Sequence, residues 1–167
     1  MSIVQTLVPE FDHEMANTRR LLEIVPGDDA GWRPHPKSYS LGDLAAHIAL
    51  LPLWGKMVLQ RPELDLGLPG NASIAQIPFT TVAELLDRFD VHAREARAAL
   101  ASMSDAAMGV TWTLKNRGTP VFSAPRAGVF RSFILSHMIH HRGQLSVYLR
   151  LRDVPLPSLY GPTADTQ

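Results

Sequence analysis

The chain has 167 residues, 46% of them hydrophobic, which is enough for one compact domain with a buried core. Its 16 basic residues balance 16 acidic residues, so the positive charge excess typical of nucleic-acid-binding proteins is missing. We therefore expect a single domain over residues 1–167 and no nucleic-acid partner.

Two further absences narrow the chemistry and the location. The sequence has no cysteine, which excludes disulfides, thiolate metal ligands and a cysteine nucleophile. It begins without a basic and apolar leader, and it lacks the roughly 20 consecutive apolar residues of a membrane span. We expect a cytoplasmic protein with no membrane partner, in which any metal has nitrogen or oxygen ligands.

The first predicted element is a helix over residues 4–25. Its apolar side chains recur at three- and four-residue spacing, at Leu7, Phe11, Met15 and Leu22. The sequence PGDD at residues 26–29 ends this helix. A loop with two prolines follows at residues 31–38, and Trp32 predicts that the loop is ordered, because exposing a tryptophan is costly.

The second predicted helix begins near Ser40, which together with Asp43 has the spacing of a capping box. Its apolar face contains Leu44, either His47 or Ile48, and then Leu51, Trp54 and Val58. Proline inside a helix removes a hydrogen bond, so Pro52 predicts a kink or local break. Residues 60–78 are expected to form a long connection.

The third predicted helix starts at a second capping-box pair, Thr81 and Glu84, and extends to Leu100. Two short runs at 110–114 and 119–122 flank the turn residues 115–118, which predicts a hairpin.

A fourth helix is predicted over residues 125–152, where the prolines at 155 and 157 end it and a polar tail follows. Four amphipathic helices without sustained strand alternation favour an all-α fold, an antiparallel four-helix bundle with a short hairpin between helices three and four. The long links leave the exact topology open.

Histidines on the inner faces of these helices suggest a metal site. His137 and His141 lie four residues apart, so their rings stack on one face of the fourth helix, and His47 occupies an inward position on the second. Three neutral imidazoles match a catalytic zinc site, which keeps one coordination position open. The alternative is that they are packed core histidines. No HExxH motif is present, so a zinc-protease interpretation is disfavoured.

Several neighbouring residues receive secondary roles. Gln144, on the same face as the histidine pair, is the candidate catalytic residue that positions a water or substrate carbonyl, and His140 is expected to flank the site. Asp43 has the spacing to orient His47, but its capping role is favoured. His92 has the spacing to approach the site, although a packed histidine is the favoured interpretation. His13 and His35 receive no role, and Trp54 and Trp112 are expected in the core.

Three stretches in this order resemble the DinB-like family of bacterial bundle proteins. They are WRPHPKSYSLGDLAAH at residues 32–47, HMIHHRGQ at 137–144 and PLPSLYGPTAD at 155–165. The resemblance implies a DinB-like four-helix bundle, often a homodimer, with a divalent metal held by His47, His137 and His141.

The functional expectations are less specific. The first is an enzyme with zinc or nickel that acts on a small-molecule substrate, by thiol (S-) transfer, with a low-molecular-weight thiol as cofactor, or by metal-assisted hydrolysis. The second is a non-catalytic metal-binding or stress-response module. A third possibility assigns the apolar residues 50–54 to dimerisation.

Overall fold

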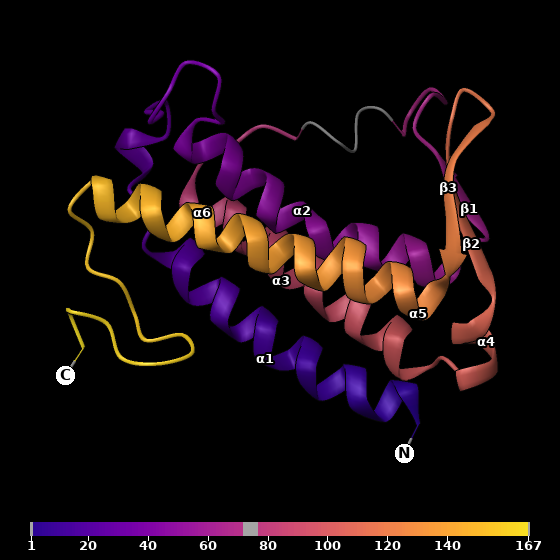
Figure 1. The fold of residues 1–167 in the computed structure, drawn as a ribbon. Coiled ribbons are helices and arrows are strands. Elements are labelled where there is room, and N and C mark those ends of the chain that lie inside the picture. Colours follow the sequence, from indigo (N-terminus) through magenta and orange to yellow (C-terminus); the bar gives the residue numbers. More distant parts are fainter. Residues whose placement is uncertain (1, 72–76, 167) are drawn as a thin grey trace.

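The computed structural model of the protein describes residues 2–71 and 77–166. Its long helical segments are α1 (Ile3–Glu23), α2 (Leu41–Gln60), α3 (Val82–Ala101) and a continuous segment made of α5 (Arg126–Val129), η3 (Phe130–Ser136) and α6 (His137–Leu151) (Figure 1). These match the predicted helices. Two short helices in the described residues are η1 (Gly27–Asp29) and α4 (Asp105–Gly109).

The residue immediately before α2 and the residue immediately before α3 each cap the helix that follows. The Ser40 hydroxyl accepts a hydrogen bond from the Asp43 backbone N–H at 3.1 Å, and Thr81 accepts from the Glu84 N–H at 3.2 Å. The carboxylate of Asp43 does not complete the predicted capping box, because it makes no hydrogen bond to any described residue. Its side chain is therefore free for another role.

Two pairs of neighbouring helices are antiparallel. Along α1 and α3, Arg19 binds Asp90 while Arg97 binds Asp12, so the start of one helix lies beside the end of the other. Helices α2 and α6 are related in the same way, because His47 near the start of α2 meets residues of α6 whereas the C-terminal half of α2 packs on η3.

The expectation of a fully antiparallel bundle is wrong for the other two pairs. The early part of α2 contacts the middle of α3 through the Ala49 carbonyl and His92, and Lys56 forms an ion pair with Glu95 further along both helices, so α2 and α3 are parallel. Helices α1 and α6 are also parallel, because the ion pairs between their two helical segments advance in the same direction along both. A helix of 20 residues such as α2 is about 30 Å long, and the connection 61–81 is long enough to return this distance.

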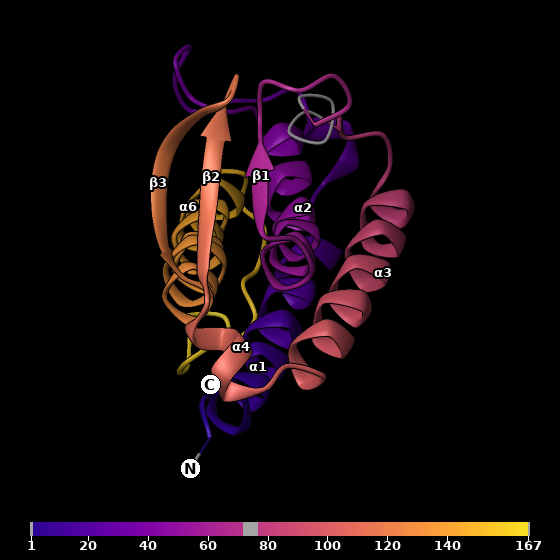
Figure 2. The same ribbon diagram turned by 90° about the vertical axis from the view of Figure 1, so that its right-hand side faces the viewer.

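A three-stranded sheet corrects the all-α prediction. It consists of β1 (Glu63–Asp65), β2 (Thr111–Asn116) and β3 (Thr119–Pro125) in that order, and it lies at the end of the helices where α5 begins (Figures 1 and 2). Strands β2 and β3 confirm the predicted hairpin, whereas β1 adds a parallel strand from the connection that follows α2. Three residues are too few for a strand to show alternation in the sequence.

The hairpin turn is fixed by its backbone and by an acidic side chain from β1. Arg117 and Gly118 both have positive φ, +50° and +79°, as a two-residue hairpin turn with the twist of the strands requires. The Asp65 carboxylate accepts hydrogen bonds from the N–H groups of Gly67, Arg117 and Gly118 at 2.7–2.8 Å. Asp65 therefore ties β1 to the turn.

The regularity of two helices differs from the prediction. Of the two effects predicted for Pro52, a kink or a local break, the break does not occur, because α2 is one continuous helix from Leu41 to Gln60. The fourth helical segment contains seven π-helical residues, Phe130–Ser136, immediately before His137. A π-turn places one more residue in the turn than an α-turn, so it changes the phase of the residues on its two sides.

The core lies between the helices and extends under the sheet. Its largest fully buried side chains include Phe11, Phe89, Phe130 and Trp112, so the prediction that Trp112 is a core residue is confirmed. In the segment suggested for dimerisation, residues 50–52 are also buried, whereas Leu53 and Trp54 are half-buried. Within the described ranges, no helix has the length and apolar character needed to cross a membrane.

Candidate metal centre

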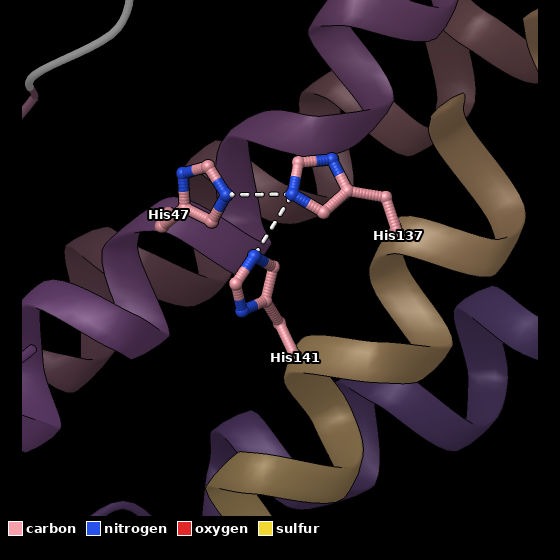
Figure 3. Close-up of side chains that lie close together, drawn as sticks. All are labelled: His47, His137 and His141. Atoms are coloured by element: carbon pink, nitrogen blue, oxygen red, sulfur yellow. Dashed lines mark hydrogen bonds between the residues drawn. The ribbon is translucent and has the colours of Figure 1, made fainter. Parts of the chain in front are cut away.

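The structure brings the rings of His47, His137 and His141 together between α2 and α6 (Figure 3). The Nε2 atom of His137 lies 3.4 Å from that of His47 and 2.8 Å from that of His141. Each histidine offers a nitrogen within 4.8 Å of the others. For comparison, the nitrogen ligands of a tetrahedral zinc ion lie about 3.4 Å apart, given Zn–N distances of about 2.1 Å. The donor set therefore fits one such ion.

Close packing of the two helices makes this convergence possible. A Cβ atom at Gly55 of α2 would lie 3.2 Å from the Phe130 ring and 3.3 Å from the Ile134 side chain, both in η3. These contacts are tighter than ordinary van der Waals distances, so glycine lets α2 approach the π-helical segment. His47 lies eight residues earlier on α2, where the antiparallel helix presents His137 and His141.

The histidines lie at the edge of the buried stripe of α6. The fully buried positions of this helix are Met138, Arg142, Leu145 and Leu149. His137 and His141 are each one position before a member of this stripe and are half-buried. Their rings are therefore removed from bulk water on one side and remain near the surface on the other.

Burial keeps all three imidazoles neutral. Desolvation, followed by repulsion from His141 and His137, lowers the pKa of His47 to about 4. Desolvation also lowers the pKa of His137, with a further decrease from His141 and an opposing effect of the Phe133 carbonyl. The pKa of His141 is lowered by desolvation and partly restored by its hydrogen bond to Gln144. Neutral rings have the free lone pairs that metal ligation requires.

One ring nitrogen in the group is poorly satisfied. The Nδ1 atom of His137 is buried without a well-formed hydrogen bond to any residue in the described ranges, and the Phe133 carbonyl is the group that raises the pKa of this ring. The three Nε2 atoms meanwhile compete for each other as hydrogen-bond partners. A cation among them would satisfy all three lone pairs at once.

Gln144 contacts one of the three histidines directly. Its Oε1 atom lies 2.7 Å from Nδ1 of His141, so Gln144 accepts a hydrogen bond from that ring. This contact fixes the tautomer in which Nε2 of His141 carries a lone pair toward the other two histidines. Gln144 is thus a positioning residue for His141.

A cavity of about 540 Å³ opens beside His47. Its described wall contains Tyr39, Asp43, His47, Leu50, Trp54, Ile77 and Pro78. The Tyr39 ring stacks on His47 with centroids 5.8 Å apart and meets His141 edge-on at 6.3 Å. The cavity therefore connects directly to the ring that α2 contributes to the triad.

The cavity shows what the sequence analysis missed. Tyr39 and Asp43 lie within the stretch that carried the family resemblance, but neither was assigned to a cavity, because the elements that complete the wall are distant in sequence. Trp54 was expected in the core; it packs against Phe133 at a centroid distance of 5.9 Å and also lines the cavity.

The remaining histidines stay outside the triad. His140 is exposed and flanks His141 with a centroid distance of 5.0 Å, as expected. His92 does not reach the site; its Nδ1 atom lies 3.4 Å from the Ala49 carbonyl, in agreement with the packed interpretation. His13 and His35 lie elsewhere, and His13 contacts Asn17.

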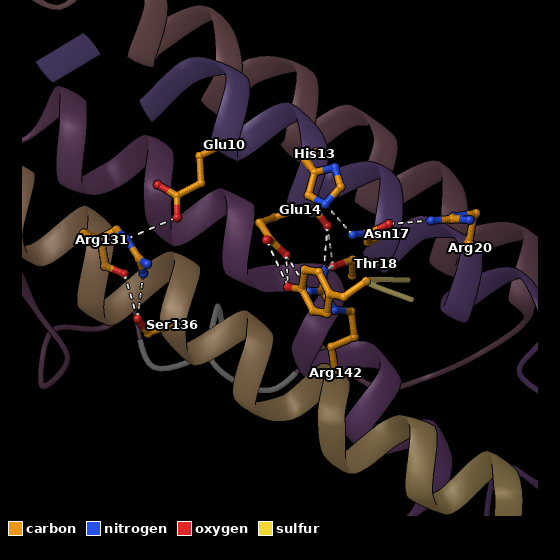
Figure 4. A network of polar contacts seen from close by, with 10 residues as sticks. Glu10, His13, Glu14, Asn17, Thr18, Arg20, Arg131, Ser136 and Arg142 are labelled. Carbon is orange, nitrogen blue, oxygen red and sulfur yellow. Dashed lines mark hydrogen bonds and ion pairs between the residues drawn. The ribbon is translucent and has the colours of Figure 1, made fainter. Parts of the chain in front are cut away.

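A second polar cluster, which the sequence analysis did not identify, lies on the face of α6 that packs against α1. Arg142 and Glu14 of α1 form an ion pair in the protein interior between α1 and α6, where they are 2% and 5% exposed (Figure 4). Arg142 also donates to the Glu14 carbonyl and to the Thr18 hydroxyl at 3.0 and 3.1 Å. The Tyr160 hydroxyl of the C-terminal tail donates to the Glu14 carboxylate. The sign of this cluster in the sequence is that Arg142 falls at the helical spacing of the apolar residues Met138 and Leu145.

Comparisons with known proteins agree with this fold. Residues 10–145 match the model of the DinB superfamily. A DinB-like protein from Bacillus subtilis has a similar structure, with a TM-score of 0.70 and 18% identity over 94% of this chain and 99% of that one. A DinB-like protein from Bacillus cereus gives a TM-score of 0.66 and 20% identity over 91% and 94%, respectively. No curated protein matches the chain significantly. The chain belongs to the DinB superfamily.

Proposed function

We propose that His47, His137 and His141 bind one divalent metal ion and that the protein is a metal-dependent enzyme acting on a small molecule. The convergence of three neutral imidazole nitrogens from two helices carries this proposal. Imidazole ligands suit zinc or nickel.

The surroundings of the triad support catalysis over a purely structural ion. Structural zinc sites are commonly closed by four protein ligands, whereas catalytic sites have three and keep one position open. Among the described residues, the group of potential ligands contains three histidines and no fourth His, Asp or Glu. The cavity beside His47 offers space for a small molecule at this position.

The reaction class that we favour is thiol transfer, with metal-assisted hydrolysis as the second. When bound, the ion would act as a Lewis acid that lowers the pKa of a thiol or water. The chain itself contributes three tasks. The triad holds the ion, Gln144 fixes the orientation of His141, and the apolar wall of the cavity excludes water from one side of a bound molecule. A low-molecular-weight thiol is the expected second reactant for transfer.

The experiment compares wild-type protein, purified without an affinity tag, with the variants His137→Ala and His140→Ala. Elemental analysis should give about one zinc or nickel per wild-type chain and per His140→Ala chain, and none for His137→Ala. Thiol-transfer and esterase assays should show turnover that is lost with His137→Ala and kept with His140→Ala. Equal turnover in all three proteins would remove the metal from the mechanism.

The same measurements address the non-catalytic alternative. Metal bound at one ion per chain without turnover of any thiol or ester would favour a metal-binding or stress-response module. We also propose that the protein is cytoplasmic and that it forms a homodimer. Sedimentation velocity tests the homodimer directly. A single species with the mass of one chain, 18.4 kDa, would contradict dimerisation.

A further inference from the structure

The described wall of the cavity beside the triad carries a negative charge. Asp43 is the charged side chain in its described wall, and the carboxylate makes no hydrogen bond or ion pair within residues 2–71 and 77–166. Asp43 lies one helical turn before His47, so both side chains project from the same face of α2. The sequence at residues 72–76 contains no charged residue, so that stretch supplies no counter-charge.

The rest of the wall is apolar or aromatic. Leu50, Ile77 and Pro78 offer hydrocarbon surface, while the rings of Tyr39 and Trp54 offer aromatic surface. Aromatic faces attract cations because the ring quadrupole places negative potential above the ring. The carboxylate and the aromatic rings therefore favour the same kind of ligand charge.

We propose that this cavity selects small molecules with an apolar or aromatic body and a protonated amine, and that Asp43 is the residue that binds the amine. The body of the ligand packs on Leu50 and Trp54, and the ammonium group contacts the Asp43 carboxylate. A molecule with a carboxylate at the same position is disfavoured by repulsion from Asp43.

This inference deepens the proposed function, because it names the substrate class of the same site. A substrate of this class carries its reacting thiol, ester or amide at the end near His47 and its ammonium group at the end near Asp43. The two ends are therefore distinguished by charge. The proposed enzyme would act on amine-bearing compounds in preference to acidic ones.

The experiment measures binding in the absence of metal, so that it does not depend on catalysis. Two probes with the same aromatic body, 2-phenylethylamine and 3-phenylpropionate, are titrated at pH 7.5 into chelator-treated wild-type protein and into His137→Ala. The change in tryptophan fluorescence is followed, and Trp54→Phe identifies Trp54 as the reporter. We expect the amine to bind about tenfold more tightly than the acid in both proteins, the preference of a solvent-accessible charge contact.

Three variants test the role of Asp43. Asp43→Asn should remove the preference, whereas Asp43→Glu keeps the charge and should keep most of it. The helix cap is unaffected, because Ser40 binds the backbone N–H of residue 43. Asp87→Asn is the matched control, since Asp87 is an exposed carboxylate on α3 outside the cavity wall.

The outcomes separate this inference from the proposed function. Equal binding of both probes to the wild-type protein, or a preference that survives in Asp43→Asn, would overturn the assignment of Asp43. Suppose that Asp43→Asn removes the preference for the amine, but that the protein as purified contains no metal and shows no turnover. This result would support the amine-binding cavity and contradict the enzymatic proposal alone.

Discussion

His141 and Arg142 are neighbours in sequence, but their side chains belong to separate polar clusters on two different faces of α6. His141 faces α2 and meets His137 and His47, whereas Arg142 faces α1 and pairs with Glu14. Successive residues of a helix are rotated by about 100°, which makes this division possible. One helix thus carries the candidate metal centre and a buried ion pair that joins it to α1.

Breaking the buried ion pair should destabilise the protein without affecting the triad. Glu14→Ala leaves Arg142 buried without its carboxylate partner, and we expect the free energy of unfolding to fall by about 3–5 kcal/mol. The double variant Glu14→Leu, Arg142→Met removes both charges and should lose less. Urea denaturation measures both, and metal content should stay at the wild-type level. A double variant that is less stable than Glu14→Ala would contradict this view.

The attachment of the C-terminal tail to the helices should depend on the same buried ion pair. Tyr160→Phe removes the hydroxyl that lies 2.7 and 2.9 Å from the Glu14 carboxylate oxygens, and we expect a loss of about 1 kcal/mol. Limited proteolysis should then cleave the segment after Pro157 faster than in the wild type. Tyr148→Phe on α6 is the control, because its ring packs on Trp32 and takes no part in this pair.

Gln144 should affect metal affinity through His141. Gln144→Ala removes the acceptor for Nδ1 of His141, so the ring loses its fixed tautomer and orientation, and we expect the metal dissociation constant to rise by about tenfold or more. Gln144→Glu keeps an acceptor oxygen and should retain most of the affinity. Competition with a chromogenic chelator measures both variants. Wild-type affinity in Gln144→Ala would show that the contact is not needed.

The stability of the metal-free protein should fall in mild acid. The folded-state pKa of His47 is about 4, below its ordinary 6.5, so between these values the unfolded chain binds a proton that the folded chain does not. The free energy of unfolding therefore decreases as the pH drops from about 6.5 toward 4. His137 and His141 add effects of the same sign.

Thermal melts of chelator-treated protein between pH 4 and 8 measure this dependence. His47→Gln should show a shallower decline, because the group with the largest shift is gone. His140→Gln, at an exposed position, should follow the wild-type curve. An identical decline in His47→Gln would assign the pH dependence to other groups.

Local patterns predicted the helices and the triad because both depend on spacing within a helix. The apolar period located α1, α2, α3 and α6, and the four-residue spacing of His137 and His141 placed their rings together. The features that the sequence did not reveal depend on contacts between distant segments. Strand β1 is defined by its pairing with β2, and the cavity needs Tyr39 and Pro78 from different connections.

Arg142 illustrates a second limit. A charged residue on an apolar stripe has no single interpretation until its partner is known, and Glu14 lies 128 residues earlier in the chain. The prediction of the topology was limited in the same way, because the connection between α2 and α3 is long enough for α3 to be either parallel or antiparallel to α2. The contacts of Lys56 with Glu95 and of Ala49 with His92 distinguish the two directions.

The π-helical turn before His137 ties the geometry of the site to chain length as well as to side-chain identity. A π-turn holds one more residue than an α-turn, so an ordinary α-helix over the same residues would rotate His137 and His141 by about 100° relative to Phe130. Phe130 would then keep its place against Gly55 while the imidazoles turned away from His47, or the reverse. An α-helix with one residue fewer in this segment would instead keep both sides in phase, so the extra turn residue and the orientation of the ligands belong together.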